Sequence, residues 1–107
     1  ISSVAGCQAS GGAAVYSATK FAVGAFSESL RQELTGKHVR VSLLEPGAVM
    51  TELADHIRDG VRERIQGWYA SMESLQPEDI ADTVACVVTR PRRVAVSELL
   101  VRPTVQA

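Results

Sequence analysis

The 107-residue chain has little of several features that define whole classes of protein. It has only two cysteines, Cys7 and Cys86, and no CxxC pair, so neither a disulfide framework nor a thiolate zinc site is indicated. Its apolar runs, such as 13–16, fall far short of the roughly 20 residues that a membrane-spanning helix needs. Eleven basic and 12 acidic residues give a net charge of −1, which provides no field to attract nucleic acid or an anionic membrane. The composition therefore predicts neither of these partners.

What remains is typical of a globular protein. Hydrophobic residues make up 46% of the chain and charged residues 21%, and the length allows one domain at most. The sequence opens at Ile1 without an initiator methionine, a charged leader or an apolar signal core, so we expect a fragment from the interior of a longer protein. The two thiols are expected to be free and buried, which suits a reducing cytosol and predicts a cytoplasmic location.

Hydrophobic periodicity predicts a long helix followed by a strand. Residues 1–15 are small and glycine-rich, which is typical of a loop whose backbone can approach a ligand closely. Apolar residues then recur at spacings of three and four over 15–34, the period of one helix face, and Gly36 marks the expected end. Apolar and polar residues alternate over 39–44, which predicts a short strand, and the Glu-Pro-Gly of 45–47 ends it.

The second half of the chain repeats this order after an irregular segment. Residues 50–75 are polar, and glycines at 60 and 67 are expected to restrict them to one or two short helices. Gln76-Pro77-Glu78-Asp79 is a helix start, and the helix must stop before Pro91. A final strand is predicted over 94–101. Helix, strand, helix and strand in this order indicate an α/β fold with a parallel sheet.

Tyr16 and Lys20 are the first residues that suggest chemistry. At positions i and i+4 of a helix, their side chains leave the same face. A nearby cation stabilises a phenolate, which would help the tyrosine to transfer protons near neutral pH. Taken alone, the spacing is a weak signal and favours an exposed Tyr–Lys pair on an amphipathic helix.

The context favours the catalytic interpretation. Ser3 lies upstream of Tyr16 across the glycine-rich loop, where its hydroxyl could bond the same substrate oxygen that the tyrosine protonates. The segment from Pro46 to Thr51 reads PGxxxT and follows the first predicted strand. In this order, on a strand–helix–strand frame, the three features resemble the C-terminal half of a short-chain dehydrogenase/reductase. The resemblance covers nearly the whole chain and implies the C-terminal half of a Rossmann-type, doubly wound parallel sheet.

The resemblance also implies roles for individual residues. Ser3 would orient the substrate oxygen, Tyr16 would be the general acid/base, and Lys20 would ease ionisation of the phenol and bond the nicotinamide ribose. Contacts to the nicotinamide and its phosphates would come from Tyr16 and Lys20 and from the PGxxxT residues Pro46, Gly47, Val49 and Thr51. The implied reaction is hydride transfer between NAD(P)H and an alcohol or carbonyl substrate. The last strand and the Arg-Pro-Thr after it are similar to NADP-preferring members, so we expect NADP, with NAD possible.

The chain departs from the family pattern by omission. The glycine-rich phosphate loop, the Asn-Ala-Gly motif and the asparagine of the usual catalytic tetrad are absent. We therefore interpret residues 1–107 as the C-terminal catalytic portion of one NAD(P)-binding Rossmann domain whose N-terminal phosphate-binding half is missing. Such a portion is expected to be inactive alone. In the intact protein, the helix over 15–34 is expected to join subunits into a homodimer or homotetramer.

Two other functions fit parts of the pattern. An extended-branch sugar-nucleotide epimerase or dehydratase shares the YxxxK spacing, although the close serine–tyrosine spacing and PGxxxT fit the smaller branch better. A truncated or non-catalytic module would keep only interaction surfaces. His38 and His56 have no second ligand at metal spacing, so no metal site is expected. Trp68, Tyr69 and Met72 either cover the core or contact substrate, and the sequence leaves both open.

Overall fold

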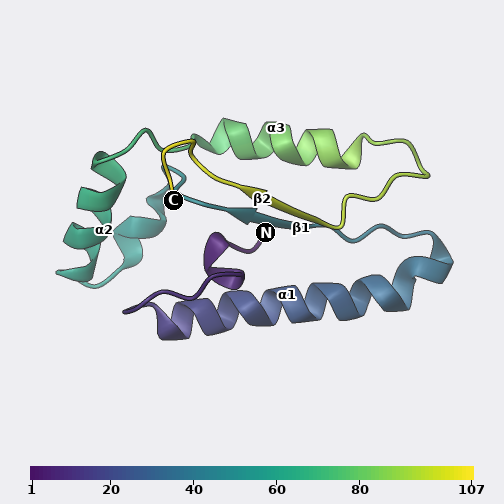
Figure 1. The fold of residues 1–107 in the computed structure, drawn as a ribbon, viewed down its shortest axis with the longest axis horizontal. Coiled ribbons are helices and arrows are strands. Elements are labelled where there is room, and N and C mark those ends of the chain that lie inside the picture. The colour runs from purple at the N-terminus through teal and green to yellow at the C-terminus, as the bar shows by residue number, and fades with distance from the viewer.

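Two parallel strands lie between two long helices (Figure 1). The computed structural model describes the backbone of residues 1–107 and every side chain except that of Ala54. The longer helix is α1 (Ala14–Leu34), and α3 (Pro77–Val88) lies across the opposite face of the strand pair. Helices on both faces of a parallel sheet are the arrangement expected of a doubly wound α/β fold, so the predicted fold class is confirmed.

The two strands are β1 (Leu43–Pro46) and β2 (Glu98–Val101), paired in parallel with Leu43 opposite Glu98 and Pro46 opposite Val101. The start of the chain flanks the other edge of β1, because the Ser2 N–H donates to the Leu44 carbonyl at 2.7 Å. In the described residues, β1 therefore lies between residue 2 and β2. Ile1–Ser3 form no assigned strand, but this bond is the kind that a neighbouring strand would make.

Both strands begin later than the sequence predicted. The expected spans 39–44 and 94–101 are wrong at their amino ends, because the ladder starts only where the Leu43 N–H donates to the Ser97 carbonyl. Before that point a side chain joins the two segments. The guanidinium of Arg40 donates to the carbonyls of Val88, Arg90 and Val94 at 2.9–3.2 Å, which ties the end of α3 to the segment that leads into β1.

The expectation that 45–47 ends the first strand is also wrong. Glu45 and Pro46 belong to β1, and the Gly47 N–H continues the ladder to the Val101 carbonyl at 2.7 Å. Since Leu43 and Gly47 donate toward β2, alternation places the missing N–H of Pro46 on the other side of the strand. Proline therefore removes no bond between β1 and β2.

The helices confirm most of the predicted boundaries. Helix α1 ends at Leu34 and continues directly into η2 (Thr35–Lys37), a 3-10 turn. The left-handed residue that closes this turn is His38 at φ 57°, not Gly36. Helix α3 begins as predicted, with the Gln76 N–H donating to the Asp79 carboxylate at 2.8 Å. The capping pattern therefore identified the start of α3 correctly, whereas Gly36 was the wrong residue for the end of α1.

The intervening segment forms η3 (Glu52–His56) and α2 (Val61–Ala70), in agreement with the expectation of one or two short helices. Gly60 precedes α2 with φ 79°, a conformation that favours glycine, and so marks a real boundary. Gly67, in contrast, lies inside α2 and does not interrupt it. Among the helices that the structure describes, not one carries an apolar stretch able to reach across a lipid bilayer.

Very few residues of the described chain are buried. Leu44 and Ala48 are the buried hydrophobic residues, and Pro46 and Pro103 join them at the carboxyl end of β1. Phe26 on α1 is 68% exposed. The expectation of buried thiols is wrong, because Cys7 and Cys86 are both exposed. The covering that such a sheet needs is therefore incomplete within these residues.

This thin core predicts that the 107 residues do not fold cooperatively alone. Ordering the backbone costs roughly 1–2 kcal/mol per residue, and the little apolar surface buried here cannot offset that cost. Thermal unfolding of the isolated chain, followed by circular dichroism, should show a broad, shallow change together with strong binding of a hydrophobic dye. A sharp sigmoidal transition without dye binding would contradict this expectation.

Candidate functional site

The predicted serine lies in the first turn of the chain, beside the predicted tyrosine–lysine helix. Ser3 caps the short 3-10 helix η1 (Val4–Gly6), and its Oγ accepts the Ala5 N–H at 3.2 Å. Its neighbour Ser2 is buried and donates from Oγ to the Lys20 carbonyl at 3.1 Å. Ser2 thus bonds β1 through its backbone and α1 through its side chain. These two bonds hold Ser2 in place and so fix the position of Ser3, the next residue.

Gly6 allows η1 to lie directly on α1. A Cβ at this position would come within 2.6 Å of the Ser2 Oγ and 3.0 Å of the Lys20 carbonyl oxygen, closer than such atoms can approach. Glycine is therefore required by contact here, not by its backbone conformation. The contact brings the turn that carries Ser3 against the part of α1 that contains Lys20.

Tyr16 and Lys20 lie one above the other on α1, as their spacing predicted. The Lys20 Nζ is 5.5 Å from the centroid of the Tyr16 ring, within the range of a cation–π contact. The Tyr16 side chain is partly exposed, so a substrate can reach it, and the buried Ser17 follows it on the other side of the helix. A phenol and an ammonium are therefore adjacent at a surface that faces solvent in these residues.

Helix α2 adds a second phenol near the first. Burial raises the pKa of Tyr69, and the charge of the nearby Tyr16 raises it further. Tyr69 contacts Trp68, with ring centroids 5.5 Å apart, and α2 comes close to the loop before α1 at Arg64 and Gly12. Tyr69 therefore lies near Tyr16, and contact between this aromatic group and a substrate stays a prediction.

The predicted cofactor-contacting segment forms a loop held from three sides. The Gly47 N–H bonds the end of β2, and the Ala48 N–H donates to the Gln106 Oε1 at 2.9 Å. Leu75 donates to the Ala48 carbonyl at 2.9 Å and accepts the Met50 N–H at 2.8 Å. Among the described residues, none accepts the N–H of Val49, which leaves a donor for a bound group. Thr51 caps the following turn by accepting the Leu53 N–H at 3.4 Å.

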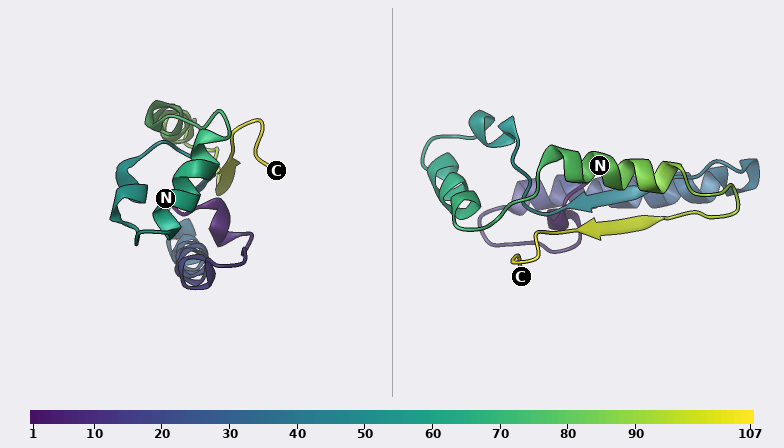
Figure 2. Two further views of the ribbon diagram at one scale, coloured as in Figure 1. Left: turned by 90° about the vertical axis from the view of Figure 1, so that its left-hand side faces the viewer. Right: turned by 90° about the horizontal axis from the view of Figure 1, so that it is seen from above.

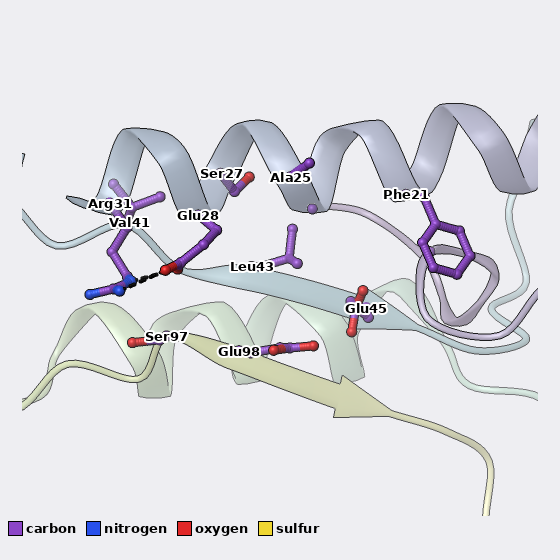
Figure 3. A pocket seen from close by; sticks show the side chains of 12 residues that line it. Phe21, Ala25, Ser27, Glu28, Arg31, Val41, Leu43, Glu45, Ser97 and Glu98 are labelled. Carbon is purple, nitrogen blue, oxygen red and sulfur yellow. Dashed lines mark hydrogen bonds and ion pairs between the residues drawn. The ribbon is translucent and has the colours of Figure 1, made fainter. Parts of the chain in front are cut away.

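A cavity of about 390 Å³ lies between α1 and the two strands, on the sheet face that carries Glu45 and Glu98 (Figure 3). None of the predicted site residues lines it. Glu45 is only 2% exposed. Burial raises the pKa of its carboxyl, the neighbouring Glu98 raises it further, and a hydrogen bond with Cys7 opposes the shift. Desolvation and the charge of Glu45 likewise raise the pKa of the Cys7 thiol, which makes it a poor nucleophile.

The structure thus puts the predicted residues into two groups. Ser3, Tyr16 and Lys20 come from η1 and α1, which Ser2 and Gly6 hold together. Pro46 ends β1, and the other PGxxxT residues form the loop after it, shown beside the end of β2 in Figures 1 and 2. Among the side chains described, no cluster of three His, Cys, Asp or Glu could hold a metal ion. Sequence reasoning assigned Glu45 to a segment that ends the first strand, and it did not identify Gln106, which forms part of no local motif.

Comparisons with known proteins agree with this arrangement. A family model described as short chain dehydrogenase matches residues 1–62. An uncharacterized oxidoreductase of Staphylococcus saprophyticus is 39% identical over 110 residues, covering all of this chain and 44% of that protein. The Dehydrogenase/reductase SDR family member 11 of Bos taurus is 41% identical over 93 residues, which cover 85% of this chain and 36% of that protein. The chain therefore spans less than half the length of these relatives.

Among solved structures, the closed form of serine dehydrogenase complexed with NADP+ superposes with a TM-score of 0.90 at 36% identity. The superposition covers 99% of this chain and 43% of that one. The likeness therefore extends over nearly all of the described backbone, including the turn at Ser3 and the loop after β1.

The buried Glu45 carboxyl predicts a pH-dependent stability. Because its pKa is raised on folding, the neutral form stabilises the fold below the ordinary glutamate pKa, and that stabilisation is lost as the pH rises through the folded value. Glu45→Gln in the full-length protein should therefore raise the melting temperature more at pH 8 than at pH 4.5.

Calorimetry at both pH values measures this difference. Glu52 is exposed, so Glu52→Gln removes a carboxylate that folding does not bury, and this variant serves as the matched control. An equal shift for Glu45→Gln at the two pH values would contradict the prediction.

Proposed function

The chain belongs to the short-chain dehydrogenase family, and on this premise we propose that it is the C-terminal catalytic portion of an NADP-dependent oxidoreductase. The substrate would be a small molecule with an alcohol or carbonyl group, and NAD could replace NADP. The single observation that carries the proposal is the position of the Lys20 ammonium 5.5 Å from the Tyr16 ring, on a helix to which the serine-bearing turn is bonded. The NADP+ bound by the structural relative supports the choice of cofactor.

We assign the chemistry on the protein side to three residues. In reduction, the Tyr16 hydroxyl gives its proton to the carbonyl oxygen while the adjacent carbon accepts a hydride, and oxidation reverses both transfers. Lys20 provides the positive charge that favours the phenolate left behind. The Ser3 oxygen already accepts the Ala5 N–H, so its own hydrogen is free to donate to the substrate oxygen and orient it.

The residues present also fit a bound nicotinamide cofactor. When bound, that cofactor supplies or accepts the hydride. Val49 would hold it through a backbone N–H that has no acceptor among the described residues. The side chains of Tyr16 and Lys20 and the loop residues Pro46, Gly47 and Thr51 would complete this half of the site. The other half would come from a phosphate-binding segment outside residues 1–107, so we propose that these residues alone bind neither NADPH nor NADH and have no reductase activity.

The proposed assembly is a homodimer or homotetramer of the full-length protein. Helix α1 exposes 80% of Val15, 45% of Phe21 and 68% of Phe26, more apolar surface than one sheet-facing stripe would leave. The exposed free thiols suit a reducing compartment, and we propose a cytoplasmic location.

Tyr16→Phe should lower kcat of the full-length protein by roughly 10²–10⁴-fold, because the ring remains while the proton donor is lost. Steady-state assays of NADPH oxidation with a panel of aldehydes and ketones would measure the effect. The same change at the neighbouring phenol, Tyr69→Phe, is the matched control and should lower kcat by less than tenfold. A Tyr16→Phe variant within a factor of a few of the unmodified protein would exclude Tyr16 as the acid, and a wild type without hydride transfer to any member of the panel would favour a non-catalytic module.

Phe26→Asp should weaken subunit association, since a charge would then enter a buried apolar contact. Sedimentation velocity of the full-length protein at micromolar concentration should show a dimer or tetramer for the wild type and for Phe26→Leu, and smaller species for Phe26→Asp. A monomeric wild type would refute the proposed assembly.

A further inference from the structure

The chain after β2 turns back onto the loop after β1. The Gln106 N–H donates to the Pro103 carbonyl at 3.0 Å, and this turn brings the Gln106 side chain to the buried Ala48. There its Oε1 accepts the Ala48 N–H at 2.9 Å, across 58 residues of sequence. Figure 2 shows the C-terminal segment curling beyond the end of β2. A side chain near the end of the described chain therefore bonds the loop proposed to contact the nicotinamide.

Gly47 makes room for this contact. A Cβ at position 47 would overlap the Gln106 Oε1 and would lie 3.1 Å from its Cδ and 3.2 Å from the Pro103 Cδ. The φ of Gly47 does not lie in the left-handed region, so backbone freedom does not explain the glycine. The Gln106 side chain occupies the space that any larger residue would fill.

The bond to Gln106 completes the support of the loop. Gly47 is held by Val101 of β2, while the carbonyl of Ala48 and the N–H of Met50 are held by Leu75. Without Gln106, the Ala48 N–H would be buried with no acceptor among the described residues, an arrangement that costs free energy. The loop would then shift to satisfy that group, and the Val49 N–H next to it would move as well.

We propose that Gln106 is a positioning residue for the cofactor. By holding the Ala48 N–H, it fixes the backbone so that the adjacent Val49 N–H stays available to the nicotinamide end of NADP(H). This inference rests on the proposed function for the role of Val49, but the hydrogen bond itself does not depend on that function.

The test uses the full-length protein with Gln106→Met and Gln106→Glu. Methionine keeps the length of the side chain but removes the oxygen, whereas glutamate keeps an oxygen that can accept the Ala48 N–H. For Gln106→Met, Kd and KM for NADPH should rise about three- to tenfold, the factor expected for one lost hydrogen bond, with kcat little changed. Gln106→Glu should stay within about twofold of the wild type at 0.3 M salt, where the added charge is screened.

Hydrogen exchange of the cofactor-free protein tests the positioning role of Gln106 separately from the proposed oxidoreductase function. The amide of Ala48 should exchange at least about tenfold faster in Gln106→Met than in the wild type or in Gln106→Glu. Unchanged exchange, or a Glu variant as impaired as the Met variant, would overturn the positioning role while leaving the proposed reaction intact. A third outcome is faster Ala48 exchange in Gln106→Met, as expected, together with a wild-type protein that neither binds nor turns over NADPH. That outcome would overturn the proposed function, and the positioning role with it.

A double-mutant cycle gives a second test. Gly47→Ala would displace the Gln106 side chain, so it and Gln106→Met disrupt the same contact. Their effects on Kd for NADPH should therefore combine to much less than the product of the single effects. Independent, multiplying effects would contradict a shared role.

Discussion

The hydrogen bonds on the two sides of β1 determine where every candidate residue lies. On one side the Leu44 carbonyl accepts the Ser2 N–H, and on the other the Gly47 N–H donates to Val101. The first bond brings the serine-bearing turn to the sheet, and the second brings the end of β2 and the C-terminal residues to the loop. Because parallel strands end at the same edge, both groups of residues gather there, as ligand sites of open α/β sheets do.

Two glycines allow these segments to approach one another, and at both positions a Cβ would meet a neighbour. Gly6 lies against the Ser2 Oγ and the Lys20 carbonyl, and Gly47 lies against Gln106 and Pro103. Each glycine therefore lies where two segments that are far apart in sequence meet. A side chain at position 6 would press against the Lys20 backbone, whereas a side chain at position 47 would displace the Gln106 side chain.

The sequence predicted the parts of the fold that depend on local periodicity. The three- and four-residue spacing located α1, and the proline and acidic residues of 76–79 located the start of α3. The Tyr16–Lys20 spacing placed both side chains on one face. The strand limits were missed because the ladder depends on the partner: Arg40 joins the segments where backbone pairing was expected. Glu45 was read as part of a turn, since its burial depends on its neighbours across the sheet. Gln106 contacts a residue 58 positions away, which no local pattern reveals.

At the amino end of the strand pair, hydrogen bonds from a side chain replace those of the backbone. Arg40 reaches three carbonyls, at Val88, Arg90 and Val94, with two nitrogens of one planar group. Lysine has a single nitrogen on a flexible stem and could not span the same three acceptors in a fixed geometry. An arginine-to-lysine exchange, conservative by charge, would thus leave carbonyls among Val88, Arg90 and Val94 unpaired and would weaken the link between the segments that lead into the two strands. What this position requires is therefore a planar group with several donors, and a positive charge alone does not meet that requirement.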